Sequence, residues 1–203
     1  MLEDLTTLIQ SAGYLGLFFI IFAESGLFFG FFLPGDSLLF TAGFLASQGY
    51  FNIWLLAPLM FIAAVLGDNV GYWTGQKYGR ELFERKNSMF FRKEYLLQAE
   101  AFYERHGKKT ITLARFIPAV RTFAPIVAGI ARMDYKAFLA YNLLGGVLWG
   151  LGMTLAGYFL GRVIPNADEL VLPIVAGIIV ISIVPALLHF NRGNEAKKRG
   201  WKL

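Results

Sequence analysis

Two long stretches of the chain contain no charged residue, and each is long enough to cross a lipid bilayer as a helix. They span residues 137–160 and 170–190. A helix that crosses a bilayer needs about 20 predominantly apolar residues, so the sequence predicts a membrane span at each place. A third apolar stretch, 53–76, is interrupted by Asp68 alone and predicts a further span.

The composition agrees with membrane spans and excludes several other classes of protein. Of the 203 residues, 56% are hydrophobic and 16% are charged, whereas a soluble domain carries about 25% charged residues. The chain therefore lacks the polar surface of a typical soluble enzyme, and its length fits one domain, 1–203. It has no cysteine, and its two histidines, His106 and His189, are too far apart to suggest a metal site. We expect no metal and no cofactor.

Two more apolar stretches, 14–46 and 110–131, are broken in the middle by proline residues. Proline inside an apolar run stops a helix, and each stretch is too short for two full spans with a loop. Each therefore predicts two half-length helices that meet at a turn. Re-entrant hairpins of this kind are tolerated where protein or a water-filled cavity surrounds them. The predicted fold is all-α, a polytopic membrane protein with two re-entrant helical hairpins.

Basic residues cluster beside the apolar stretches. Sixteen of the 19 Lys and Arg residues lie in 77–109, in 132–136 or in the tail 191–203. Positive charge next to spans marks cytoplasmic loops, so these segments, including an interfacial helix expected at 94–107, are predicted to be cytoplasmic. The N-terminus is then expected on the outer side. No basic module with interleaved aromatic residues is visible, so nucleic acid is not an expected partner.

The two halves of the chain repeat a pattern. Phe32-Leu33-Pro34 recurs as Phe116-Ile117-Pro118, and Gly71-Tyr72 recurs as Gly157-Tyr158, at offsets of 84 and 86 residues. One predicted crossing separates the hairpins, so they would enter the membrane from opposite faces as an inverted repeat. Interrupted segments at corresponding positions of two halves point to a transport site near the bilayer midplane. Chance similarity between apolar segments is the alternative explanation.

Five ionisable residues lie within apolar sequence: Glu24, Asp36, Asp68, Arg115 and Arg121. An unpaired charge at the bilayer centre costs about 2.5–3.5 kcal/mol, so these groups must pair, hydrate or become neutral. Because the first half supplies only acids and the second only arginines, we predict that Glu24 or Asp36 pairs with Arg115 or Arg121. The partner of Asp68 stays open. Such pairs could also serve only to clamp the hairpins together.

The two arginines favour a site for a phosphate group. A guanidinium binds phosphate oxygens through two parallel hydrogen bonds, and Arg115 and Arg121 could flank one anionic headgroup. Glu24 or Asp36, protonated while phosphate is bound and ionised otherwise, would couple the phosphate to a proton. No P-loop occurs and no histidine lies near these motifs, so we do not expect an enzyme. The residues expected to support the site are Pro34, Gly35, Asp68, Pro118, Thr122 and Pro125.

Glycines recur every fourth residue within two of the spans. They are Gly67, Gly71, Gly75 and Gly79, followed in the later span by Gly146 and Gly150. This spacing of small residues lets helices approach closely, so we assign these glycines to packing.

Four motifs together resemble a known family. They are Glu24-Ser25-Gly26, then FLPGDSLL at 32–39, GDNVGY at 67–72 and ARFIPAVRT at 114–122. This set is similar to that of the DedA membrane proteins, the SNARE-associated or VTT superfamily, over nearly the whole chain. The resemblance implies two opposed re-entrant hairpins, an acidic pair at Glu24 and Asp36, and an arginine pair at Arg115 and Arg121.

The resemblance also implies a function. Bacterial members of the family return undecaprenyl phosphate to the cytoplasmic leaflet, so we expect a proton-coupled flippase of a lipid phosphate in the bacterial inner membrane. The partners would be this lipid, membrane lipids and protons, and self-association into a homo-oligomer stays open. The alternatives are an uncoupled phospholipid scramblase, a proton or cation antiporter, and a purely structural membrane protein.

Overall fold

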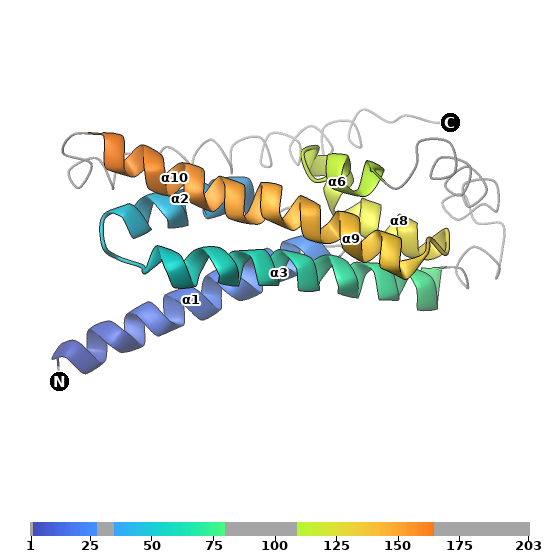
Figure 1. The fold of residues 1–203 in the computed structure, drawn as a ribbon. Helices are drawn as coiled ribbons and strands as arrows, with labels where there is room; N and C mark the ends of the chain where they lie inside the picture. Colours follow the sequence, from blue (N-terminus) through green and yellow to red (C-terminus); the bar gives the residue numbers. More distant parts are fainter. Residues whose placement is uncertain (1, 28–34, 80–108, 165–203) are drawn as a thin grey trace, which may run out of the picture.

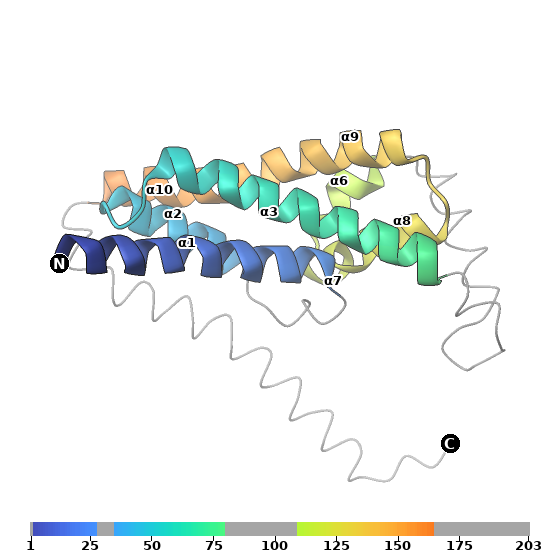
Figure 2. The same ribbon diagram turned by 90° about the horizontal axis from the view of Figure 1, so that it is seen from below.

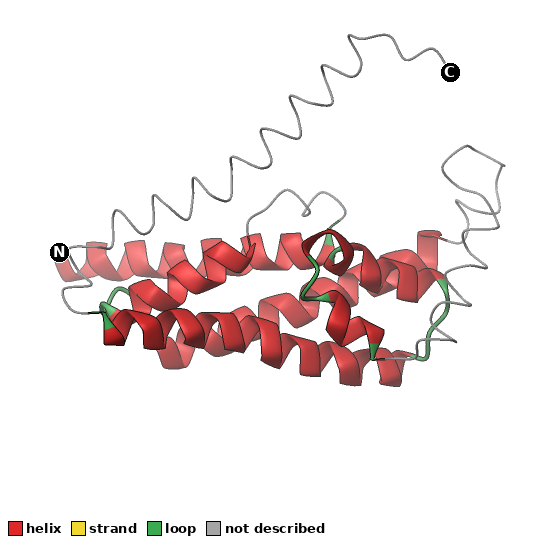
Figure 3. Cartoon of the chain, turned by 90° about the horizontal axis from the view of Figure 1, so that it is seen from above, coloured by secondary structure: helices red, strands yellow, loops and turns green. Residues whose placement is uncertain are grey.

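The computed structural model describes residues 2–27, 35–79 and 109–164, and all the regular secondary structure in these ranges is helical (Figure 3). The predicted span 170–190, the helix at 94–107 and the tail 191–203 lie outside the described residues. The helices are α1 (Leu2–Gly26), α2 (Gly35–Ser47), α3 (Ile53–Thr74), η2 (Gly75–Gly79), α6 (Thr110–Ala114), α7 (Pro118–Arg121), α8 (Phe123–Ile130), α9 (Tyr135–Gly146), η3 (Val147–Leu151) and α10 (Gly152–Val163).

Two long helices run antiparallel along the molecule (Figure 1). The first joins α3 to η2 over 27 residues, and the second joins α9, η3 and α10 over 29 residues. Both are apolar and, at about 40 Å or more, long enough to cross a bilayer core of about 30 Å. The side chains of Asn52 and Asp134 begin them by accepting hydrogen bonds of 2.9 Å from backbone N–H groups in the first turn. The predicted spans 53–76 and 137–160 are confirmed as helices.

The first broken stretch forms two antiparallel helices at one end of the molecule (Figure 2). Helix α1 ends at Gly26, and α2 begins at Gly35, the second residue of the Pro-Gly pair where a helix break was expected. Helix α1 starts at Leu2, well before the expected residue 14, because apolar patterning marks only the part of a helix that avoids water. Its apolar part is Ala12–Gly26. Helix α1 packs on α3, whereas α2 packs on α10.

The second broken stretch forms three short helices, α6, α7 and α8, beside the other end of α3. The first break precedes Pro118, because a residue before proline avoids the helical region and Ile117 is extended (φ −112°, ψ 106°). The second break falls at Thr122 and not at Pro125. Pro125 lies in the first turn of α8, where its missing N–H interrupts no intrahelical hydrogen bond.

Glycines let the backbones of the short helices α2 and α8 contact the long helices directly. A Cβ atom on Gly157 of α10 would collide with the carbonyl oxygen of Phe40 in α2. In the other half, a Cβ on Gly75 would collide with the carbonyl oxygen of Ile126 in α8. Each short helix thus packs on the long helix of the opposite half of the chain. The close packing predicted for the glycine runs is confirmed.

Two apolar cores lie at separate positions along the long helices. One joins α1, α2, α3 and α10 and includes Trp149, and the other includes Tyr72 stacked on Phe138 at a ring separation of 4.5 Å. Along α3, Asp68 lies between residues of the first core and Tyr72 of the second. Asn142 lies likewise between Phe138 and Trp149. The buried polar side chains of Asp68 and Asn142 therefore lie between the two cores.

Candidate functional site

Arg121 is the centre of the site and binds two carboxylates from the first broken stretch. Its Nη1 donates to Oδ1 of Asp36 at 2.5 Å, and its Nη2 donates to Oε1 of Glu24. Arg121 stands at the end of α7, Glu24 near the end of α1 and Asp36 at the start of α2. The breaks in both stretches thus bring these three charges together, although Arg121 lies 85 residues from Asp36 and 97 from Glu24 along the chain.

The three groups differ in their access to the surroundings. The side chains of Glu24 and Arg121 are 2% and 9% exposed, whereas that of Asp36 is 41% exposed. A buried charge must keep its partner, because leaving it uncompensated is costly. Asp36 is therefore the carboxylate that can exchange Arg121 for water, a proton or another anion at the lowest cost.

Trp149 completes the immediate surroundings of this ion pair. Its indole Nε1 donates to the same Oδ1 of Asp36 at 2.5 Å. The guanidinium carbon of Arg121 lies 4.8 Å from the ring centroid, and that of Arg115 lies 5.9 Å from it. Both distances fall within the range of cation–π attraction. One indole thus contacts both arginines and one carboxylate.

Arg115 has a separate set of partners. Its Nη2 donates to Oδ2 of Asp68 at 2.6 Å and to Oδ1 of Asn142 at 2.5 Å. The amide of Asn142 in turn donates to the carbonyl oxygen of Val65 at 3.1 Å. The side chains of Arg115 and Asp68 are 4% and 5% exposed. This buried network joins α6, α3 and α9.

The pairing differs in part from the sequence expectation. The meeting of acids from the first half with arginines from the second half is found, and Arg121 takes both Glu24 and Asp36. Arg115 pairs instead with Asp68, whose partner the sequence left open. The reason is geometric: α6 packs against the long helices, where Asp68 and Asn142 lie, before the chain turns at Pro118 toward the first stretch.

Two glycines make room for the charged side chains. A Cβ on Gly35 would collide with the carboxylate of Glu24. A Cβ on Gly145 would come within 2.6 Å of Cδ of Arg115. Any other residue at these positions would displace a group of the site. Gly35 was expected to support the site, whereas Gly145 was not.

Of the other residues expected to support the site, three lie in the short helices α7 and α8 or at their junction. The fourth, Pro34, lies outside the described residues. Pro118 starts α7 and so defines the turn between the two arginines. Thr122 is 1% exposed at the junction of α7 and α8, and Pro125 is buried in α8. These residues shape the break that carries Arg121.

Two residues of the site had not been expected from the sequence. Trp149 lies in η3, a five-residue π-helical turn, and turns of this kind inside α-helices are frequent at functional sites. Asn142 is fully buried and precedes Trp149 by seven residues, about two helical turns. The available signal was a polar amide within the uncharged stretch 137–160, but it does not say which charge the amide would meet.

The site contains more carboxylates than guanidinium groups. Glu24, Asp36 and Asp68 surround Arg115 and Arg121, so with all five ionised the cluster carries one surplus negative charge. Among the described residues, no three His, Cys, Asp or Glu side chains are grouped so as to hold a metal ion. The arrangement can therefore bind a proton at a carboxylate, or replace a carboxylate on Arg121 by another anion.

Comparisons with known proteins identify the family. A family model for the VTT domain matches residues 33–159. The protein named DedA from Escherichia coli is 50% identical over 191 residues, which cover 93% of this chain and 87% of that protein. This chain is a VTT-domain protein of the DedA family. The resemblance of its motifs to that family is thereby confirmed.

Other DedA-family relatives are also named as membrane proteins. An uncharacterized membrane protein of Mycobacterium leprae is 47% identical over 180 residues, covering 89% of this chain and 80% of the relative. The inner membrane protein YqjA of Escherichia coli is 35% identical over 149 residues, covering 73% and 68%. No solved structure matches the chain. Together with the two long apolar helices, these names place this VTT-domain protein in a membrane.

The VTT domain contains most of the site. Asp36, Asp68, Arg115, Arg121 and Trp149 lie within the matched range, whereas Glu24 precedes it. Helix α1 therefore adds to the domain a carboxylate that binds its central arginine.

Proposed function

We propose that this VTT-domain protein transports a lipid phosphate, undecaprenyl phosphate, to the cytoplasmic leaflet of the bacterial inner membrane, in exchange with or together with protons. The observation that carries the proposal is one buried guanidinium, Arg121, held by two carboxylates of which one is partly exposed. A phosphate presents the same oxygen geometry to an arginine as a carboxylate does. It can therefore take the place of Asp36.

Charge balance links the exchange to a proton. A phosphate that arrives beside Glu24 and Asp36 adds negative charge to a cluster that already has three carboxylates for two arginines. Protonation of one carboxylate removes the repulsion. We assign this step to Glu24 or Asp36, and the carboxylate that stays ionised keeps Arg121 oriented. Arg115, near the same indole, is the second cation facing the bound phosphate.

The orientation of α2 supports an anion at this place. Its first residues are Gly35 and Asp36, so its N-terminus faces Arg121 and Glu24. A helix N-terminus carries partial positive charge and unpaired N–H groups. Once one of the two carboxylates is neutral, this end of a 13-residue helix adds to the attraction for phosphate.

The lengths of the helices support two re-entrant hairpins. The apolar part of α1, Ala12–Gly26, is about 22 Å long and α2 about 20 Å, and both are shorter than a bilayer core of about 30 Å. The reciprocal packing of α2 on α10 and of α8 on α3 supports an inverted repeat. In this arrangement Arg121 and its partners lie near the midplane, and the C-terminal tail is cytoplasmic.

A flux assay in liposomes tests the proposal. Purified protein is reconstituted, and movement of undecaprenyl phosphate between leaflets is measured with and without a pH gradient, beside ordinary phospholipids. Arg121→Gln should abolish the movement, whereas Lys136→Gln, which removes an exposed cation outside the site, should leave it unchanged. Movement of all phospholipids without a gradient would indicate a scramblase. Proton or cation flux without any lipid phosphate would indicate an antiporter.

A further inference from the structure

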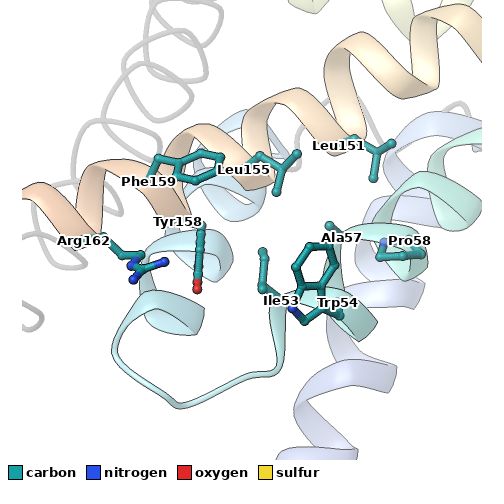
Figure 4. Close-up of a pocket in the computed structure, with 9 residues that line it drawn as sticks. All are labelled: Ile53, Trp54, Ala57, Pro58, Leu151, Leu155, Tyr158, Phe159 and Arg162. Carbon is teal, nitrogen blue, oxygen red and sulfur yellow. The ribbon is translucent and has the colours of Figure 1, made fainter.

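A second candidate site lies at the end of the molecule where α2 leads into α3. A cleft of about 270 Å³ separates the first turns of α3 from α10. Ala57 and Pro58 line it from α3, whereas Leu151 lines it from the end of η3 and Leu155 from α10 (Figure 4). None of the four residues carries a polar side chain, so the walls of the cleft suit hydrocarbon.

The rim of the cleft has a different character. Trp54 is 87% exposed and Phe159 59% exposed, so two large aromatic side chains stand free at its edge. Arg162 and Tyr158 lie at one end, with the guanidinium carbon of Arg162 5.7 Å from the tyrosine ring (Figure 4). Within the described residues, no carboxylate pairs with Arg162. The cleft is therefore apolar along its length and cationic at one end.

The dimensions fit one leaflet of a membrane. Leu151 and Arg162 are eleven residues apart on one continuous helix, about 16 Å, and half of a bilayer core is about 15 Å. Tryptophan and tyrosine concentrate where the core meets the headgroups, which agrees with Trp54 and Tyr158 at the end near Arg162. The cationic end then lies at headgroup level and the apolar end near the midplane.

We infer that this cleft binds the hydrocarbon chain of a phosphate-bearing lipid, with the phosphate at Arg162. The apolar surface accounts for the chain, and the guanidinium of Arg162, which pairs with no carboxylate of the described residues, complements the negative charge of the headgroup. Leu151 is two residues from Trp149 along the helix, so the deep end of the cleft lies at the same level as the site around Arg121, on another face of the long helix. A role of the cleft as the approach of the transported lipid rests on the proposed function, whereas binding of a lipid does not.

Photo-crosslinking tests the binding without any transport. The full chain in nanodiscs is irradiated with phosphatidylglycerol or phosphatidylcholine that carries a diazirine on one acyl chain, and the adducts are mapped by mass spectrometry. Adducts of both lipids are expected on Leu155 and Phe159. Because both lipids carry a phosphate, Arg162→Gln should lower the adducts of both about tenfold, and the control Lys136→Gln should change neither.

Two further variants keep the result decisive. Leu155→Trp fills the cleft and should remove both adducts while the protein stays monodisperse. In a chain without native cysteines, Leu155→Cys is combined with single cysteines placed along 170–190. A disulfide there would show that the chain's own segment occupies the cleft and would overturn the inference, as would equal adduct yields with and without Arg162. Because ordinary phospholipids are used, failure of transport leaves this outcome unaffected.

Discussion

The indole N–H of Trp149 donates a hydrogen bond to Oδ1 of Asp36, the oxygen that also accepts from Arg121. The carboxylate oxygen is therefore shared between a permanent cation and a neutral donor. If Arg121 turns to another anion, Trp149 still holds Asp36 in place. The long helix that ends in α10 thus restrains the one partly exposed carboxylate of the site.

Replacing Trp149 separates its two contacts. Trp149→Phe removes the hydrogen bond to Asp36 but keeps an aromatic face beside Arg121, so we expect a loss of about 1.5–3 kcal/mol for a bond to a charged group. Trp149→Ala also leaves a cavity in the first core, so it should lose about 3–5 kcal/mol in all. Thermal unfolding of the purified variants in detergent gives the order. Equal stability of both variants would show that the ring contributes nothing beyond its N–H.

Arg115 and Asp68 should contribute to the stability of the protein as a coupled pair. Arg115→Met or Asp68→Leu alone leaves a buried charge without its partner, so each should destabilise the protein by about 3–5 kcal/mol. The double variant removes both charges and should recover much of this loss. A double-mutant cycle from unfolding measurements checks the coupling. Additive losses would mean that the ion pair does not hold α6 to α3.

The two carboxylates of Arg121 should differ in their effect on stability. Glu24→Gln removes a charge from a side chain that is 2% exposed, whereas Asp36→Asn changes one that is 41% exposed. We expect a loss of about 2–4 kcal/mol for Glu24→Gln, because buried pairs are strongly coupled, and about 1 kcal/mol for Asp36→Asn. Under the proposed function, one of these two changes, Glu24→Gln or Asp36→Asn, should also make transport insensitive to a pH gradient. Chemical unfolding and the liposome assay measure the two effects.

Close glycine contacts should be intolerant of a single methyl group. Gly157→Ala places a Cβ against the carbonyl oxygen of Phe40, and α2 must shift away from α10 to accept it. We expect about 1–3 kcal/mol of destabilisation from this overpacking. The matched control is Gly16→Ala in α1, where a Cβ meets no atom within 4 Å. It should be neutral or stabilising, as measured by thermal unfolding beside the parent protein.

Much of the fold follows from local sequence. The uncharged stretch 137–160 became the central part of one long helix, and 53–76 became α3 with the first two residues of η2. Pro118 located a break in the second hairpin, although Pro125 did not, since a proline in a first turn breaks nothing. The early start of α1 was not predictable from apolar patterning, because its first residues are helical without being uniformly apolar.

The charged residues of the candidate site could be predicted from the sequence, but which of them contact one another could not. Glu24, Asp36, Asp68, Arg115 and Arg121 stand out because charge within apolar sequence must be compensated. Tryptophan is common in apolar sequence, so nothing local distinguished Trp149 before its contacts were known. The oppositely charged partners lie 47 to 97 residues apart along the chain.

The sequence by itself determined which segments avoid water, where the two broken stretches are interrupted and which charged groups need partners, because these properties depend on the composition and spacing of neighbouring residues. Only the tertiary structure decided that Arg121 pairs with both acids of the first broken stretch while Arg115 pairs with Asp68. Such pairing depends on how far each short helix reaches along the long ones, and that distance is set by the glycine contacts between them.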